Sequence, residues 1–162
     1  GAALPPARDR ARKGRAKVMA VFSRDIPVHF SDTDPAGIIF YPRYFEMTSA
    51  LIEDWFAEEL GYPFDALHQG MEFGVPTLSL DVSFSAASRI ADLLRFTLTV
   101  EKLGKSSFTL AIKAVCGDEE RLAMQQVLVF AALGGKVKPV PIPKDLRARM
   151  ESFRMTESAK DS

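Results

Sequence analysis

The stretch Asp32-Thr-Asp-Pro-Ala-Gly-Ile-Ile-Phe-Tyr-Pro-Arg-Tyr44 predicts a strand end, then a loop with a carboxylate, then the start of a helix. Pro35 pushes the backbone of Asp34 away from the helical region. Gly37 permits a turn with positive φ, and Pro42 suits a first helical turn, where its missing N–H is not needed. Free N–H groups at such a helix start favour anions. A carboxylate beside them is typical of an acyl-transfer site.

The rest of the chain predicts one helix and several strands. Apolar residues recur at three- and four-residue steps up to Leu60, and Gly61 follows as a stop signal, which predicts a helix over 42–60. Alternating apolar and polar residues predict strands over 19–30, 78–84, 94–101, 108–114 and 122–133. The short connections between the last four make them antiparallel, and the apolar face that they share must be covered. We therefore expect an α+β fold in which a curled sheet wraps around the helix.

Composition limits the class of protein. The 162 residues are 47% hydrophobic, which suits one domain with its own core. Basic and acidic residues number 21 each, so no strong electrostatic case exists for nucleic acid or an acidic membrane as a partner. No stretch has the apolar length needed to span a bilayer, and Cys116, the single cysteine, has no partner for an intramolecular disulfide. We expect a soluble, cytoplasmic protein.

The chain divides into three parts. Residues 1–18 hold six basic residues against one acidic residue and are expected to form a disordered basic tail. Residues 19–138 are expected to form the folded domain. Residues 139–162 are expected to comprise a proline-rich segment, a short helix over 144–154 and a frayed polar end.

The string from Ser31 to Phe45 resembles the signature of hotdog-fold acyl-CoA thioesterases of the 4-hydroxybenzoyl-CoA thioesterase family: an Asp, a Gly three residues later, then a Tyr and a helix. The resemblance covers roughly residues 22–133. It implies a hotdog fold, in which an antiparallel sheet wraps around one long helix. It also implies hydrolysis of an acyl-CoA thioester without a metal or cofactor. Pro42 follows Tyr41, where another branch of the family has His, and this sides with an aromatic acyl group.

The resemblance also implies roles for particular residues. Asp34 would act as nucleophile or as general base for water, and sequence does not decide between them. Backbone N–H groups around Tyr41 would hold the carbonyl oxygen as it gains charge. Asp34 also has a plainer interpretation, because an Asp before Pro often serves only to form a turn. Two helix carboxylates, Glu46 and Glu53, are rivals for the catalytic role, although a solvated helix margin explains both.

Substrate-binding residues are implied at two further places. The hairpin Gly104-Lys105-Ser106-Ser107 resembles the family segment that meets the coenzyme A phosphates, with charge from Lys105 and hydrogen bonds from Ser106 or Ser107. An ordinary exposed turn is an equally good explanation of it. Gly74 and Val75 resemble the segment that lines the acyl pocket. Arg89 is a second, weaker phosphate candidate.

Other chemistries and partners find less support. His29 and His68 lie far apart, and no acidic or cysteine cluster completes a metal set at recognisable spacing. A hotdog dehydratase would need a histidine in the motif, which has none, whereas a non-catalytic acyl-CoA or acyl-carrier binding module remains an alternative. A single sheet around one helix leaves an edge strand exposed. We therefore expect a homodimer or homotetramer.

Overall fold

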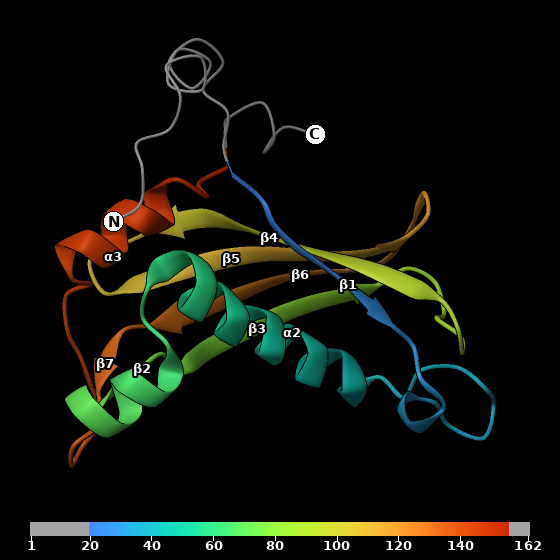
Figure 1. Ribbon diagram of the computed structural model, residues 1–162, viewed down its shortest axis with the longest axis horizontal. Helices are drawn as coiled ribbons and strands as arrows, with labels where there is room; N and C mark the ends of the chain where they lie inside the picture. Colours follow the sequence, from blue (N-terminus) through green and yellow to red (C-terminus); the bar gives the residue numbers. More distant parts are fainter. Residues whose placement is uncertain (1–19, 156–162) are drawn as a thin grey trace, which may run out of the picture.

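The computed structural model describes residues 20–155 and shows a five-stranded antiparallel sheet that curves around one helix (Figure 1). The tail predicted for 1–18 and the polar end of the chain lie outside the described residues. The sheet has the order β1-β4-β5-β6-β3. Its strands are β1 (Phe22–Pro27), β3 (Thr77–Phe84), β4 (Leu93–Leu103), β5 (Ser107–Cys116) and β6 (Glu119–Val129). The helix is α2 (Pro42–Trp55).

Helix α2 forms as its sequence predicts and is fixed at its C-terminal end. Its backbone continues through a π-helical turn at Phe56–Leu60 and stops at Gly61, whose φ is +72°. Nη1 of Arg149 donates to the carbonyl oxygen of Leu60 at 2.7 Å and lies where a Cβ on residue 61 would be. The positive φ favours glycine, and a Cβ here would displace the guanidinium, which satisfies a carbonyl at the negative end of the helix.

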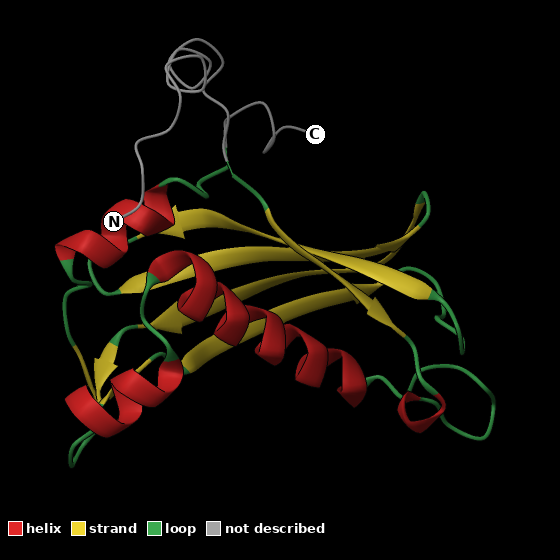
Figure 2. Cartoon of the chain, in the orientation of Figure 1, coloured by secondary structure: helices red, strands yellow, loops and turns green. Residues whose placement is uncertain are grey.

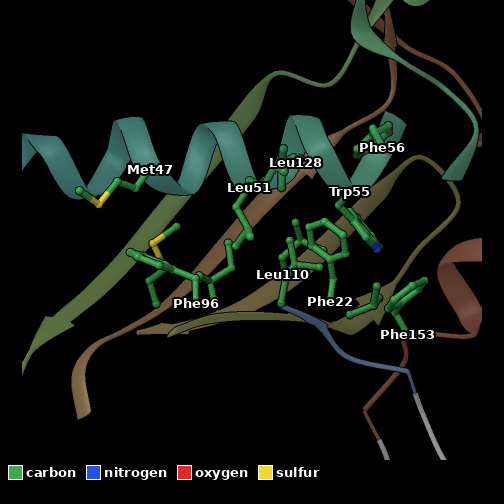
Figure 3. Packing of buried hydrophobic residues seen from close by; sticks show 14 of the residues in the cluster. Phe22, Met47, Leu51, Trp55, Phe56, Phe96, Leu110, Leu128 and Phe153 are labelled. Atoms are coloured by element: carbon green, nitrogen blue, oxygen red, sulfur yellow. The ribbon is translucent and has the colours of Figure 1, made fainter. Parts of the chain in front are cut away.

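The core lies between α2 and the concave face of the sheet (Figure 3). Leu51 and Trp55 of the helix are 1% and 0% exposed, and they pack over Phe96 of β4 and Leu110 of β5, which are also fully buried. The alternation seen in the sequence accounts for this, since every second residue of the central strands faces the helix. Truncating Leu51 to alanine should cost about 2–5 kcal/mol of stability, as is usual for a buried leucine.

The ends of the predicted strands differ from the structure in two places. The first strand is β1 alone, and a 3-10 turn at Phe30–Asp32 replaces its predicted end. The predicted last strand, 122–133, is wrong as a single strand, because the chain leaves the main sheet at Phe130. There the backbone N–H donates to the carbonyl oxygen of Ser106 at 2.8 Å, and the ring stacks on Phe73 at 5.3 Å.

Two strands after this break and one strand before β3 form a second, small sheet that was not predicted. Its strands are β2 (Phe73–Gly74), β7 (Ala131–Ala132) and β8 (Lys138–Pro139), in the order β2-β7-β8. Figure 2 shows it beside the helical segment Ala66–Met71. The second sheet therefore belongs to one end of the molecule only.

The segment after β8 packs into the core. Helix α3 (Lys144–Glu151) is shorter than the predicted helix, which extended to residue 154. The apolar residues of this segment are buried: Ile142, Leu146, Met150 and Phe153. Val100 donates its N–H to the carbonyl oxygen of Phe153, and Met155 donates to that of Val100, at 2.9 and 2.8 Å. Beyond the last β1 pair, Phe22 with Leu98, the C-terminal segment thus pairs with the edge of β4.

Candidate active site

Asp34 lies in a tight hairpin between β1 and α2. Its backbone N–H donates to the carbonyl oxygen of Ile38, and its carbonyl accepts from Gly37, both at 2.9 Å. Thr33 and Ile39 pair across this hairpin. Gly37 has φ +79°, so the sequence-based assignment of a positive-φ turn is correct at this position. The hairpin holds Asp34 on a rigid turn at the edge of the sheet.

The carboxylate of Asp34 is fixed through one oxygen only. Oδ1 accepts a hydrogen bond from the N–H of Ala36 at 2.9 Å, which is the side-chain to backbone turn expected of an Asp before Pro. The other oxygen, Oδ2, has no hydrogen-bond partner among residues 20–155. The half-buried side chain borders a depression lined also by Phe30, Thr33, Pro35, Gly37 and Ile90. Turn formation and an available carboxylate oxygen therefore occur together in the same residue.

Tyr41 flanks the start of α2 and offers a free backbone donor. Two of the N–H groups of the first turn are already used, since Arg43 donates to Phe40 O at 2.8 Å and Tyr44 donates to Tyr41 O at 3.1 Å. The Tyr41 N–H itself has no partner within the described part of the chain. Of the backbone N–H groups expected around Tyr41, the N–H of Tyr41 itself is therefore the available donor, and it lies at the positive end of α2.

An aromatic surface surrounds Tyr41. Its ring, 59% exposed, meets Phe84 and Phe45 edge-on, with centroids 6.2 and 6.4 Å apart, and lies 5.9 Å from Phe40. Tyr44 lies 5.7 Å from Phe84, the last residue of β3. A shallow depression runs over this surface, lined by Ile38, Ile39, Tyr41, Tyr44, Phe84, Ser85, Ala86 and Ala87. This end of the molecule can bind a flat apolar group beside the hairpin of Asp34.

A buried polar network lies beneath the same surface. The hydroxyl groups of Tyr44 and Ser88 are 2.7 Å apart, and both residues are buried. Nη1 of Arg121 donates to Ser88 Oγ at 3.2 Å and to Asp92 Oδ2 at 2.8 Å. The hydrogen bond from Arg121 lowers the pKa of Asp92, and burial raises the pKa of Tyr44. Sequence analysis missed this network because its members share no motif.

The implied substrate-binding residues lie at the other end of the sheet (Figure 1). Pro27 pairs with Leu93, so the hairpin of Asp34 lies near the start of β4, whereas Lys105 follows the end of β4. The eleven residues of β4 separate the two by roughly 35 Å. Gly74 lies at the same end of the sheet as Lys105. Its neighbour Phe73 stacks on Phe130, and the backbone N–H of Phe130 donates to the carbonyl oxygen of Ser106.

The residues implied to bind substrate, around Lys105 and Gly74, are held in place by backbone contacts. The carbonyl oxygen of Lys105 accepts from Ile142 N at 3.0 Å and from Nη2 of Arg147 at 3.1 Å, while its side chain is exposed. Ser107 and Val75 are half-buried. A Cβ on Gly74 would approach Leu133 Cδ1 to 2.7 Å, so the absence of a side chain at residue 74 leaves room for the Leu133 side chain.

The other candidate residues lie apart from the Asp34 hairpin and from the residues around Lys105. Glu46 is exposed and pairs with Arg43 at 2.9 Å, and Glu53 faces solvent. His29 is largely exposed, and its N–H donates to Asp32 Oδ2 at 2.9 Å. Among residues 20–155, no three His, Cys, Asp or Glu side chains come together as a metal set would require. No helix in that range is both long and apolar enough to cross a bilayer.

Comparison with known proteins decides the family. The sequence profile of the thioesterase-like superfamily matches residues 28–150. The chain belongs to this superfamily. Within it, the chain is 27% identical over 135 residues to the acyl-CoA thioesterase YbgC of Haemophilus influenzae, covering 82% of this chain and 96% of that protein. It is 25% identical over 127 residues to the 4-hydroxybenzoyl-CoA thioesterase of Pseudomonas sp., covering 73% and 89%.

Solved thioesterase structures have a similar fold. The 1,4-dihydroxy-2-naphthoyl-CoA thioesterase of Synechocystis superposes with a TM-score of 0.73 at 20% identity, over 81% of this chain and 96% of that one. The hotdog fold predicted from the motif is thus confirmed, as is the family resemblance. The prediction of a thioester hydrolase agrees with the names of both sequence relatives.

Proposed function

We propose that this protein hydrolyses the thioester bond of an acyl-CoA at the Asp34 end of the fold. The observation that carries the proposal is that the Asp34 hairpin presents a carboxylate oxygen, and the start of α2 that follows it presents the Tyr41 N–H, both without partners in the described chain. Thioester hydrolysis needs both groups, one to attack or to activate water and one to hold the carbonyl oxygen. Membership in the thioesterase-like superfamily supports this assignment.

Asp34 serves in one of two ways. As nucleophile, its free oxygen adds to the thioester carbonyl carbon, coenzyme A leaves as a thiolate that takes up a proton, and water cleaves the mixed anhydride. As general base, it takes a proton from the water that attacks the carbonyl carbon and returns it to the departing thiolate. In both routes the Tyr41 N–H stabilises the negative oxygen, a contribution of about 3–4 kcal/mol in comparable sites.

An aromatic acyl group is the substrate class that the site favours. The rings of Phe40, Tyr41, Phe45 and Phe84 form the surface next to the hairpin, and aromatic groups stack or meet edge-on at such surfaces. One sequence relative is a 4-hydroxybenzoyl-CoA thioesterase, which is consistent with such a substrate.

The separation of the two residue groups supports a dimeric site. Strand β3 is an edge strand that pairs only with β6 among residues 20–155, and its apolar residues Leu78 and Leu80 are 61% and 47% exposed. Pairing of two β3 strands about a two-fold axis would cover them. It would also place the start of one β3 beside the end of the other. Val75 and Lys105 of the partner subunit would then lie at the Asp34 end of this chain.

Release of free thiol from short, long and aromatic acyl-CoAs tests the activity. We expect turnover to be highest with aromatic acyl groups. Absence of turnover with every acyl-CoA would contradict the proposal and favour the alternative of a non-catalytic acyl-CoA or acyl-carrier binding module.

Subunit mixing tests the shared site. Asp34→Asn and Lys105→Ala proteins are unfolded together, refolded as a mixture and measured at low acyl-CoA concentration. If each site uses Asp34 of one subunit and Lys105 of the other, every mixed dimer keeps one intact site, and the mixture should regain about a quarter of the wild-type activity. Activity equal to the mean of the two parent variants would show that no site combines Asp34 of one subunit with Lys105 of the other.

A further inference from the structure

We propose that Tyr44 and Ser88 are positioning residues that hold the hairpin of Asp34 against the first turn of α2. The catalytic part of this inference rests on the proposed function, whereas the structural part does not. Ser88 lies outside the motif that identifies the family, whereas Tyr44 lies within it and also lines the aromatic depression near Tyr41. Neither residue lines the depression that Asp34 borders.

Ser88 joins the loop between β3 and β4 to the hairpin. Its carbonyl oxygen accepts the N–H of Ile39 at 2.8 Å, and the neighbouring Arg89 pairs with Ile38. Residues 38 and 39 form the returning arm of the Asp34 hairpin, which then leads into Tyr41. The backbone of Ser88 therefore fixes the arm that connects the carboxylate to the free N–H.

The side chain of Ser88 joins the same loop to the helix. Its hydroxyl is 2.7 Å from that of Tyr44, which lies in the first turn of α2 three residues after Tyr41. Ser88 is fully buried and Tyr44 is 2% exposed, so water does not compete for this hydrogen bond. A buried hydroxyl without a partner is costly, and the pair therefore specifies one arrangement of helix and loop.

Arg121 anchors the loop to the sheet from the other side. A single nitrogen, Nη1, donates to Ser88 Oγ, to the carbonyl oxygen of Ala87 at 2.9 Å and to Asp92 Oδ2. Asp92 in turn accepts the N–H of Arg89 at 2.9 Å. Helix, hairpin, loop and β6 thus meet in one connected set of hydrogen bonds, and the pair Tyr44–Ser88 is its link to α2.

The test compares Tyr44→Phe and Ser88→Ala with a matched control, Tyr62→Phe. The control also removes a tyrosine hydroxyl that makes a hydrogen bond, to Asp145 at 2.7 Å, but at the opposite end of the fold. The full chain is used throughout. Tyr44→Phe keeps the ring and its packing, so it reports on the hydrogen bond even if Ser88→Ala fails to fold.

Hydrogen exchange gives a readout that does not depend on activity. In Tyr44→Phe and Ser88→Ala we expect faster exchange in peptides that cover residues 34–41 and 85–92, while peptides from β5 keep wild-type protection. Tyr62→Phe should leave residues 34–41 unchanged. Wild-type protection of residues 34–41 in both variants would overturn the proposal, whether or not the protein hydrolyses any acyl-CoA.

Kinetics test the catalytic consequence. Small displacements of reacting groups cost rate rather than binding, so we expect Tyr44→Phe to lower kcat about tenfold with KM within about twofold. The double variant should be no slower than Ser88→Ala alone, because both changes remove the same hydrogen bond. Unchanged kcat in Tyr44→Phe, or additive losses in the double variant, would refute a positioning role for this pair. Absence of turnover by the wild type would instead refute the proposed function. Hydrogen exchange would then decide whether Tyr44 and Ser88 hold the Asp34 hairpin in place.

Discussion

Ala36 donates its backbone N–H to one carboxylate oxygen of Asp34 at 2.9 Å, and the second oxygen has no partner among residues 20–155. The first contact sets the orientation of the side chain, because it closes a turn that Pro35 and Gly37 also favour. The second oxygen is then held at the surface in a fixed direction. Replacing the carboxylate by an amide would therefore keep the shape of the side chain and remove its charge and basicity.

Asp34→Asn should lower turnover strongly while the fold survives. Asparagine retains an oxygen that can accept from Ala36, but it loses the charge and basicity that either catalytic route needs. We expect kcat to fall by about 10²–10⁴ and the unfolding temperature to stay near that of the wild type. Thiol release and thermal unfolding measure the two effects. Glu46→Gln and Glu53→Gln are the controls, and loss of activity in either of them, with Asp34→Asn active, would move the catalytic role to α2.

Lys105→Ala should weaken substrate binding more than it slows the reaction. A phosphate contact is shared by ground and transition states, so its loss raises KM with a smaller change in kcat. The increase should diminish at high salt, where exposed charges are screened. Steady-state kinetics at low and high ionic strength provide the measurement. Lys113→Ala removes another exposed lysine, from β5, and should leave KM unchanged. An unchanged KM for Lys105→Ala at low salt would make it an ordinary turn residue.

Leu80→Glu should yield a folded monomer with little activity. Leu80 lies on the edge strand β3 and is 47% exposed in one chain, and a charge there opposes burial against a second copy. Sedimentation velocity at micromolar concentration measures the change, and circular dichroism checks folding. Val21→Glu is matched in exposure, at 46%, and should remain a dimer. A monomeric wild-type protein would refute the dimeric site.

Asp92→Asn should destabilise the protein at neutral pH and much less in acid. The hydrogen bond from Arg121 lowers the pKa of Asp92, so its contribution is present above the pKa of the unfolded chain, about 4, and is lost as pH falls through the lower folded value. We expect a difference in unfolding free energy of about 1–2 kcal/mol at pH 7, which narrows below pH 4. Urea unfolding at several pH values tests this. Asp118→Asn, in an exposed turn, is the control variant, and a constant difference for Asp92→Asn would contradict the assignment.

Local patterns in the sequence predicted most of the fold. The three- and four-residue spacing up to Leu60 located α2, and alternation located the strands of the main sheet. The break at Phe130 escaped prediction because the residues around it are apolar on both sides, so no change of period marks it. Its cause is tertiary, because the Phe130 ring stacks on Phe73 and residues 131–132 pair with β2.

The candidate site was only partly predictable. Asp34 and Tyr41 share one motif, and the structure places Asp34 in the hairpin and Tyr41 at the start of α2, directly after it. The motif said nothing of where Lys105 lies, although turns of an antiparallel sheet alternate between its ends and could have shown the separation. The bond between Tyr44 and Ser88 joins residues 44 positions apart and depends on packing that no local pattern encodes.

Helix α2 and the π-helical turn that continues it are held by a hydrogen bond at each end, which fixes the number of residues between the two contacts. Ser88 holds Tyr44 in the first turn of α2, and Arg149 holds the carbonyl of Leu60 at the end of the π-helical turn that continues it. One inserted or deleted residue between them would rotate one end against the other by roughly 100°. Either the hydroxyl pair or the guanidinium contact would then be lost. We therefore expect natural length variation to be confined to the surface turns, and relatives to keep the interval from residue 44 to residue 60 constant.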